Sequence, residues 1–285
     1  MNSFSGKSII VTGGSRGIGK AIALEFFRQG ASVIICSRNR KELDKTCIKV
    51  DPSMNRFIGM TADVSKESDC KKLVRLAIKN FGKIDVLINN AGIIGEVGEF
   101  EKNNIKRWPS AFLVNVLGTV FMSKYVLPLM KKNGGGKIIN FAGGGVGGKT
   151  PLPHFSAYYT SKMAVVGFTE TLAVEVKRDN IQVNSIAPGA INTSITDYTI
   201  GQGLDKVGEE MYRRLLTQKK QGGDSLQSVL DLVIFLSSEK SSHITGRLLS
   251  AKWDKIDMLE KQKGEDNDLF KLRRIDDNLF FRKRL

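Results

Sequence analysis

Short apolar runs alternate along this chain with longer segments in which apolar residues recur every three or four positions. The short runs predict buried strands, and the longer segments predict amphipathic helices. Because the short runs are apolar on both faces, we expect a parallel sheet covered by helices on both sides. The expected strands are 8–14, 31–39, 56–65, 83–92, 136–143, 181–189 and 243–251, and the expected helices are 20–30, 40–50, 67–82, 105–132, 156–178 and 228–239.

This alternation predicts a single doubly wound α/β domain, a Rossmann fold, over residues 1–251. Two segments fall outside the alternation. Residues 194–226, called the lid below, are expected to form a helical insertion over the carboxyl ends of the strands, where it can contact a substrate. Residues 252–285 are expected to form a C-terminal extension.

Composition and charge narrow the functional classes. The net charge is +15, but no run of Lys and Arg is interleaved with aromatic residues, so we expect no nucleic-acid partner. No apolar stretch reaches 18 residues, so we expect no membrane partner. The cysteines Cys36, Cys47 and Cys70 lack metal-ligand spacing, and the chain has only two histidines. We therefore expect no metal site, and a cytoplasmic location.

The first expected strand leads into a glycine-rich turn. The sequence TGGSRGIG places Gly13, Gly17 and Gly19 between a strand and a helix. Glycine permits a tight turn, and the N-terminus of the following helix can bind a pyrophosphate. At the end of the second strand, where an acidic residue would select NAD, the chain has Arg38, which Arg16 can assist. Since guanidinium groups bind phosphate in a bidentate manner, we expect NADP(H) as the cofactor.

Tyr158 and Lys162 are four residues apart in the expected helix 156–178 and therefore share one of its faces. A tyrosine with an ordinary pKa of about 10 is a poor acid–base catalyst at neutral pH. A neighbouring ammonium group is expected to lower that pKa toward the useful range. The pair can then move a proton to or from a carbonyl oxygen during hydride transfer.

Taken together, these motifs resemble the short-chain dehydrogenase/reductase family over about residues 5–251. The resemblance implies an NADP-preferring oxidoreductase that interconverts a carbonyl and a secondary alcohol, with Tyr158 as general acid/base and Lys162 activating it. Asn115 is similar to the family's active-site Asn, which bends its helix and holds a water for proton relay. With the long apolar helices, the resemblance also implies a homodimer or homotetramer. It further assigns to the cofactor site Ser15, Ile18, Asp63, Val64, Asn89, Ala91, Gly92, Pro188, Gly189, Ile191 and Thr193, as well as Tyr158 and Lys162.

One family feature has no counterpart here, namely the serine that follows the fifth strand and hydrogen-bonds the substrate. Matching on Asn140 puts that position at Gly143, and counting back from Tyr158 puts it at Gly145. Ala142 also lacks a hydroxyl group. The substrate-contacting residues are therefore expected among Gly143, Gly144, Gly145 and His154.

Three explanations of this departure stay open. The glycines could present backbone N–H groups in place of the hydroxyl, since glycine allows close approach to a ligand. A side chain of Thr150, His154 or Ser156 could supply the donor instead. Alternatively, the protein could be a catalytically weak NADP-binding protein that acts through partners.

The substrate itself is not identified by these patterns. The lid mixes basic and acidic side chains, and a cationic lid would suit a phosphate-bearing substrate, such as a sugar-linked or 3-oxoacyl compound. The mixed signs leave this choice open. The residues concerned are Lys206, Arg213, Arg214, Lys219 and Lys220 against Asp197, Asp205, Glu209 and Glu210.

Overall fold

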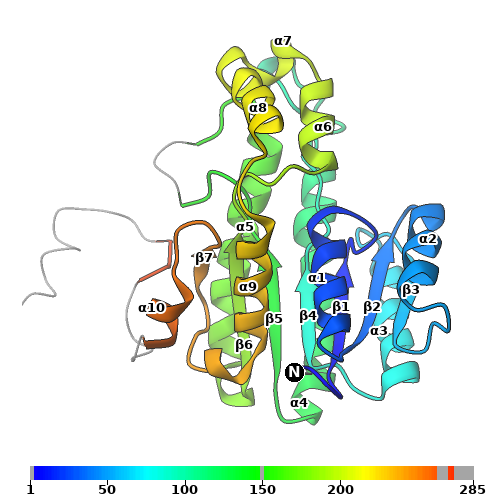
Figure 1. Ribbon diagram of the computed structural model, residues 1–285. Coiled ribbons are helices and arrows are strands. Elements are labelled where there is room, and N and C mark those ends of the chain that lie inside the picture. Colours follow the sequence, from blue (N-terminus) through cyan, green and yellow to red (C-terminus); the bar gives the residue numbers. More distant parts are fainter. Residues whose placement is uncertain (1–2, 148–150, 262–268, 273–285) are drawn as a thin grey trace, which may run out of the picture.

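The computed structural model describes residues 3–147, 151–261 and 269–272. They form one α/β domain around a seven-stranded parallel sheet of order β3-β2-β1-β4-β5-β6-β7 (Figure 1). The strands are β1 (Ser8–Thr12), β2 (Ser32–Ser37), β3 (Phe57–Thr61), β4 (Val86–Asn89), β5 (Gly136–Phe141), β6 (Ile181–Ala187) and β7 (Leu248–Ser250). The predicted Rossmann fold is confirmed. Because the strand order reverses between β1 and β4, a ligand crevice is expected at their carboxyl ends.

Helices cover both faces of the sheet, as the strand pattern predicts. Neighbouring residues of β1 enter different cores: Ile9 and Val11 pack in one apolar cluster, and Ile10 packs in the other. The first cluster is covered by α1 (Gly17–Arg28), α2 (Arg40–Val50) and α9 (Leu226–Ser237), and the second by α3 (Glu67–Phe81), α4 (Gly118–Lys132) and α5 (Ser156–Glu175). Short 3₁₀ turns span Phe100–Lys102, Lys177–Asp179 and Glu239–Ser241.

Two expected elements are shorter than the sequence pattern indicates. The helix expected from residue 105 contains Pro109, which disfavours helical backbone before it, and regular helix begins only after this proline. A π-helical turn over Phe112–Leu117 then leads into α4. The last strand, expected over 243–251, is reduced to β7 because Gly246 has a φ of +68° and turns the chain.

The segment Phe112–Lys132 is apolar and long enough, by length and composition alone, to cross a membrane. Its 21 residues have a mean hydropathy of 1.5. In this fold the segment packs against α3 and the sheet, with Met122, Val126 and Met130 fully buried. Only 33% of its most apolar window is buried, and Leu113 and Leu117 are exposed.

The lid forms α6 (Ser194–Gly201), α7 (Leu204–Val207) and α8 (Glu209–Gln221), which lie together at one end of the molecule (Figure 1). The extension includes α10 (Ile256–Lys261). Residues 269–272 then lie beside β7: the Leu248 N–H donates to Phe270 O at 2.6 Å, and the Leu272 N–H donates to Glu170 Oε1 at 3.0 Å. Within the extension, the described residues 269–272 therefore pack beside β7 and α5 of the same domain.

Candidate active site

The glycine turn after β1 brings two strand ends into contact. Gly13 has a φ of +66°, and a Cβ placed there would lie 3.0 Å from Ala91 Cα and from Asn90 Nδ2. A Cβ at Gly19 would overlap the same Asn90 amide. That amide is fixed by its hydrogen bond to Thr12 O at 2.9 Å. Glycine is thus required at both positions for the NNAG segment after β4 to close against the turn.

The helix that follows this turn leaves its N-terminus available to an anion. In the described structure α1 begins at Gly17 with no side-chain cap, and its first turn contains no acidic residue. The first N–H groups of a helix lack intrahelical acceptors and carry a partial positive charge. A pyrophosphate fits such a helix end.

A cavity extends from this turn along the carboxyl ends of β1 to β4 and reaches the start of α6. Most of the predicted cofactor residues line it, namely Gly13, Ser15, Arg16, Gly17, Ile18, Gly19, Arg38, Asp63, Val64, Ala91, Gly92 and Thr193. The sequence reasoning missed Cys36, Ser37, Ala62, Asn90, Ile93, Val114, Ser194 and Ile195, which line it as well. Ser37 and Asn90 could have been found, because both belong to motifs that were recognised.

Asn89 does not line this cavity, contrary to the prediction. Its side chain is buried in the protein, where Nδ2 donates to Asn140 Oδ1 at 2.9 Å. Successive side chains of a strand point to opposite sides, so Asn89 faces the core while Asn90 reaches the cavity. The Asn89 side chain therefore joins β4 to β5.

The predicted nicotinamide loop after β6 is also outside the cavity lining, except for Thr193. Asp224, which the sequence reasoning missed, holds this loop: its Oδ2 accepts from the Ala190 N–H at 2.7 Å. Gly189 has a φ of +83°, and a Cβ there would meet Asp224 Oδ2 at 2.7 Å. Pro188 and Ile191 belong to the same loop, and Ile191 packs against one of the two cores.

Arginines line the cavity next to the end of β2. This is the position at which an acidic side chain would select NAD. Ser15 Oγ donates to Ser37 Oγ at 2.9 Å, which joins the glycine turn to the end of β2. Arg38 and Arg16 line the cavity beside this contact. One carboxylate is close: Glu42 Oε1 lies 3.6 Å from Arg16 Nη1 in an exposed ion pair. The cluster is therefore cationic, with Glu42 as a partial counter-ion.

Lys162 is held at the end of β5. Its Nζ donates to Phe141 O at 2.7 Å, and only 5% of the residue is exposed. Burial lowers the pKa of Lys162 to about 8. A Cβ at Gly92 would lie 3.4 Å from this Nζ, so the ammonium group borders the cofactor cavity.

The expected fall in the pKa of Tyr158 is not observed. Burial raises the pKa of Tyr158 to about 12. The Lys162 ammonium lies 6.0 Å from the centroid of the Tyr158 ring and is hydrogen-bonded to Phe141 O. Its charge therefore does not compensate for the burial of the phenol.

Gly143 lies directly against the Tyr158 hydroxyl. A Cβ at Gly143 would be 2.5 Å from Tyr158 Oη and 2.8 Å from Cζ. A Cβ at Gly144 would meet nothing within 4 Å. Gly145 has a φ of +90°, which disfavours any side chain, and a Cβ there would meet Leu152. The hydroxyl of Tyr158 thus occupies the space that a serine at 143 would need.

The predicted substitutes for the serine have different surroundings. Thr150 lies outside the described residues. Ser156 Oγ accepts a hydrogen bond from Trp108 Nε1 at 3.0 Å. His154 has a φ of +68°, and its buried Nδ1 has no hydrogen-bond partner in the described structure. Its ring meets the lid, because a Cβ at Gly208 would lie 3.1 Å from Nε2.

Asn115 lies in the π-helical turn and ties three segments together. Its Oδ1 accepts from the Ile93 N–H at 2.9 Å, and its Nδ2 donates to Ile93 O and to Ser161 Oγ, both at 2.9 Å. A Cβ at Gly92 would lie 3.2 Å from Asn115 Oδ1. Asn115 therefore fixes the loop after β4 against α5, next to Lys162.

Similarity to known proteins identifies the family of this chain. The family model described as short chain dehydrogenase matches residues 7–202. The chain belongs to the short-chain dehydrogenase family. It is 34% identical over 240 residues to dehydrogenase/reductase SDR family member 4 of Sus scrofa, covering 84% of each chain. It is 36% identical over 251 residues to the Caenorhabditis elegans protein of the same name, covering 86% of this chain and 94% of that one.

Solved structures of the family agree with the fold. A crystal structure of NAD⁺-bound xylitol dehydrogenase is 30% identical with a TM-score of 0.77, covering 87% of this chain and 98% of that one. A levodione reductase is 26% identical with the same TM-score, covering 87% and 96%. As a short-chain dehydrogenase, the chain is an oxidoreductase of a family that uses nicotinamide cofactors and small-molecule substrates.

Proposed function

We propose that this short-chain dehydrogenase is NADP(H)-dependent and interconverts a carbonyl and a secondary alcohol. The observation that carries the proposal is the meeting of Tyr158, Lys162 and Gly92 where the cavity ends. Lys162 borders Gly92, a cavity residue, and lies one helical turn from Tyr158. A proton-transfer group is therefore adjacent to the cofactor site.

The residues present fit a dinucleotide phosphate. The free N-terminus of α1 would hold the pyrophosphate, and the glycine turn leaves space that a Cβ would fill. Arg38 and Arg16 would bind a 2′-phosphate, because the residue that follows β2 is Arg38 and not an acidic residue, and Glu42 nearby pairs with Arg16. When bound, this cofactor supplies or accepts the hydride.

Tyr158 is proposed to protonate the substrate oxygen in reduction and to accept the alcohol proton in oxidation. With a pKa of about 12 the phenol is protonated at neutral pH, but it is a weaker acid than an ordinary tyrosine, so stabilisation of the tyrosinate is needed. Lys162 would stabilise the tyrosinate that remains, and its hydrogen bond to Phe141 O keeps it in place. Asn115 positions both groups through Ile93 and Ser161.

The glycine segment is proposed to supply the donor that the family's serine would give. Gly143 and Gly144 follow β5 after Ala142, and open space lies beside Gly144, so a substrate oxygen can approach the backbone N–H groups there. A donor of this kind contributes about 10²–10³ in rate. If a backbone N–H replaces the serine hydroxyl, the rate of hydride transfer changes but the reaction stays the same.

A second function is favoured by one observation. The Tyr158 hydroxyl faces Gly143, and its pKa is raised to about 12, which would make alcohol oxidation slow at neutral pH. A protein that binds NADP(H) and acts mainly through partners fits these facts as well. A spectrophotometric screen for NADPH consumption distinguishes the two, using simple ketones, 3-oxoacyl thioesters and nucleotide-linked keto sugars. Consumption supports the enzyme, and none across the panel supports the binding protein.

The assembly and location remain part of the proposal. Apolar side chains are exposed on the outer sides of the π-helical turn and α5, including Leu113 at 45%, Leu117 at 37% and Val174 at 77%. Exposed apolar surface of this kind favours a homodimer or homotetramer. A cytoplasmic location is proposed from the free cysteines, all three of which are buried and unpaired.

The cofactor choice is tested by replacing Arg38. Arg38→Ala is expected to weaken NADPH binding by about 10–100-fold, because a charge-assisted hydrogen bond contributes about 1.5–3 kcal/mol. NADH binding should change little, since NADH lacks the 2′-phosphate. Arg40→Ala is the matched control, as Arg40 is 81% exposed and pairs with Asp44. Fluorescence titration measures both constants, and tighter binding of NADH than NADPH by the unmodified protein would refute the cofactor assignment.

A further inference from the structure

The loop after β6, residues 188–193, is the segment expected to hold the nicotinamide half of the cofactor, and this inference rests on the proposed function. We propose that Asp224 and Lys252 are positioning residues, which hold this loop in the conformation that the nicotinamide half requires. Asp224 lies between the lid helices and α9, and Lys252 follows β7, the last strand. Two segments that are distant in sequence would therefore determine the shape of one end of the cofactor site.

Asp224 and Ala190 are joined by two hydrogen bonds. The Ala190 N–H donates to Asp224 Oδ2 at 2.7 Å, and the Asp224 N–H donates to Ala190 O at 3.0 Å. Both backbone polar groups of Ala190 are therefore bound to a single residue. The backbone of the loop cannot turn at Ala190 without breaking one of these bonds.

One glycine in each segment makes room for this contact. Gly189 has a φ of +83°, and a Cβ there would lie 2.7 Å from Asp224 Oδ2. Gly223 has a φ of +72°, and a Cβ there would lie 2.5 Å from Ala190 O. A side chain at either position would push Asp224 and Ala190 apart. The close approach of the two segments therefore depends on both glycines.

Lys252 holds the second oxygen of the same carboxylate. Its Nζ lies 2.8 Å from Asp224 Oδ1, and the two side chains are 42% and 21% exposed. The Lys252 ammonium and the Ala190 N–H hold the pKa of Asp224 below its ordinary value. Since each carboxylate oxygen has its own partner, rotation of the carboxyl group would break a charge-assisted hydrogen bond.

The backbone around Lys252 is itself fixed to the sheet. The Ala251 N–H donates to Ala187 O at 3.0 Å, next to the last paired residues of β6 and β7. Asp254 closes the turn that follows: the Ser250 N–H donates to Asp254 Oδ2 at 2.7 Å, and the Asp254 N–H donates to Ser250 O at 3.0 Å. The Lys252 side chain therefore starts from a defined position beside the end of β6.

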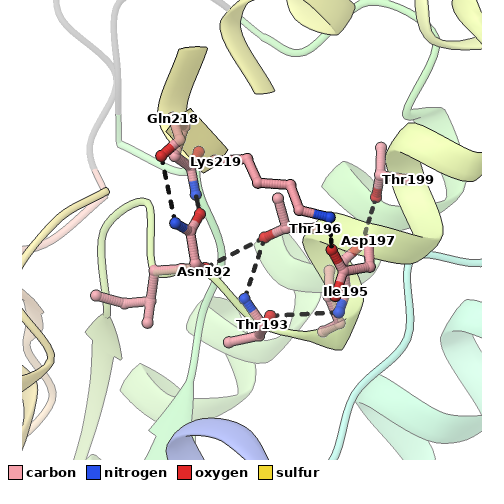
Figure 2. A network of polar contacts seen from close by, with 9 residues as sticks. Asn192, Thr193, Ile195, Thr196, Asp197, Thr199, Gln218 and Lys219 are labelled. Carbon is pink, nitrogen blue, oxygen red and sulfur yellow. Dashed lines mark hydrogen bonds and ion pairs between the residues drawn. The ribbon is translucent and has the colours of Figure 1, made fainter. Parts of the chain in front are cut away.

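The remainder of the loop connects Ala190 to the cofactor cavity. Figure 2 shows that Asn192 and Gln218 exchange two hydrogen bonds: Asn192 Nδ2 donates to Gln218 O at 3.2 Å, and Gln218 Nε2 donates to Asn192 Oδ1 at 3.0 Å. The next residue, Thr193, caps α6 and lines the cavity. A Cβ at Gly17 would lie 3.6 Å from Thr193 Cγ2, so the loop ends beside the glycine turn. A displacement of the loop would therefore reach the cavity wall.

A second ion pair of the chain supplies matched controls. Lys131 Nζ lies 2.7 Å from Asp179 Oδ2, and the two side chains are 47% and 29% exposed. Asp179 precedes β6, at the end of the sheet opposite the cofactor cavity. This pair resembles the pair of Lys252 and Asp224 in distance and exposure, but not in position. Ion pairs near the surface contribute little by themselves, so any difference between the two sets of variants reports position.

The inference is tested by measuring the Kd of NADPH and the Kd of adenosine 2′,5′-bisphosphate, which lacks the nicotinamide half. Asp224→Ala is expected to raise the Kd of NADPH at least about tenfold, because binding must then restore a loop conformation that the carboxylate had fixed. The Kd of the bisphosphate should stay unchanged, since its expected partners are Arg38 and Arg16. Lys252→Met should raise the Kd of NADPH to a smaller extent, and Lys252→Arg should leave it unchanged.

Asp179→Ala and Lys131→Met should bind both ligands as the unmodified protein does. A rise of equal size for NADPH and the bisphosphate in Asp224→Ala would overturn the inference, because it would indicate a general loosening of the fold. An unchanged Kd of NADPH in both Asp224→Ala and Lys252→Met would overturn it as well. Isothermal titration calorimetry measures all of these constants.

Asp224→Asn serves if the alanine variant does not fold. Its amide oxygen can still accept from the Ala190 N–H, whereas its NH₂ group offers Lys252 no acceptor. This variant should therefore bind NADPH as Lys252→Met does, and a Kd equal to that of the unmodified protein would contradict the role of Lys252.

Failure of this inference and failure of the proposed function are distinguishable, because the test measures binding and not turnover. A protein that binds NADPH but reduces no ketone would refute the proposed reaction, and the comparison of variants would still decide the role of Asp224. If the unmodified protein binds NADH more tightly than NADPH, the same comparison is made with NADH and ADP, and only the cofactor choice is wrong. A protein that binds neither cofactor would refute both proposals.

Discussion

Gly143 lies against the hydroxyl of Tyr158, the proposed acid–base group. The Tyr158 hydroxyl lies where a side chain at position 143 would have to be. The raised pKa of Tyr158 belongs to the same arrangement, because the phenol is buried and Lys162 is directed to Phe141 O. The glycine and the tyrosine are therefore coupled, and a change in one should displace the other.

Gly143→Ala is expected to lower kcat by at least about tenfold and to cost about 1–3 kcal/mol in the free energy of unfolding, as overpacking does. The added methyl group would push Tyr158 away from its position. Gly144→Ala is the control, because a Cβ there meets nothing within 4 Å. Steady-state kinetics and urea unfolding measure both effects. Equal behaviour of the two variants would show that Tyr158 does not depend on Gly143.

The secondary-structure elements followed from the sequence wherever burial on both faces determined the pattern. The parallel strands and most helices are examples, because apolar runs such as Ile9–Val11 can be satisfied only inside a covered sheet. The exceptions have local causes in Pro109 and Gly246. The alternation within β4 was also not resolved, so Asn89 was assigned to the cofactor in place of Asn90.

The active site was less predictable than the fold, because its properties depend on contacts between distant segments. The pKa of Tyr158 is determined by burial, and spacing along a helix does not reveal how deeply a residue is buried. The apolar side of the lid depends on the packing of Val207 against Ile94 and Phe155, which are distant from it in the sequence. In the sequence alone, residues 194–226 show a mixture of basic and acidic side chains, which left the character of the lid open.

The C-terminal residues 269–272 pack against the glycine-rich segment after β5. Leu272 packs on a small cluster that includes Ala142 and Val146, and a Cβ at Gly147 would lie 3.9 Å from Leu272 Cδ2. Leu272→Ala is expected to cost about 1 kcal/mol in unfolding free energy, since the side chain is only partly buried, and to lower kcat. Leu269→Ala, at a residue that is 55% exposed, is the control. Unchanged kcat in Leu272→Ala would show that this segment does not support the active site.

At the scale of the whole molecule, buried ionisable groups determine how stability depends on pH. Lys137 is 6% exposed, its Nζ donates to Ser242 Oγ at 3.0 Å, and burial lowers its pKa from 10.5 to about 8. Between these values the unfolded chain holds a proton that the folded chain lacks, so this group's contribution to stability rises with pH. The buried thiols lower the stability as the pH rises above about 9, because burial raises the pKa of Cys36 from 9.0 to about 12.

Lys137→Met isolates the contribution of the lysine. The free energy of unfolding of the variant is expected to exceed that of the unmodified protein most at pH 7, where burying the charge is most costly. This difference should shrink by about 1–2 kcal/mol by pH 10. Urea unfolding at the two pH values measures the difference. Lys132→Met, at an exposed position, controls for loss of a positive charge. An advantage that does not change with pH would mean that Lys137 keeps an ordinary pKa in the folded protein.

The central claim is that Tyr158 carries out proton transfer for NADP(H)-dependent hydride chemistry beside a segment without serine. Its most direct test compares NADPH consumption by the unmodified protein, Tyr158→Phe and Tyr159→Phe, with a neutral ketone as substrate. Tyr159 is the matched control, because it is the adjacent tyrosine, its side chain packs in a different cluster from Tyr158, and phenylalanine keeps the packing of its ring. We predict that Tyr158→Phe loses at least about 10²–10⁴-fold in kcat while binding NADPH as before, and that Tyr159→Phe keeps its activity. Turnover by Tyr158→Phe at the unmodified rate would contradict the claim.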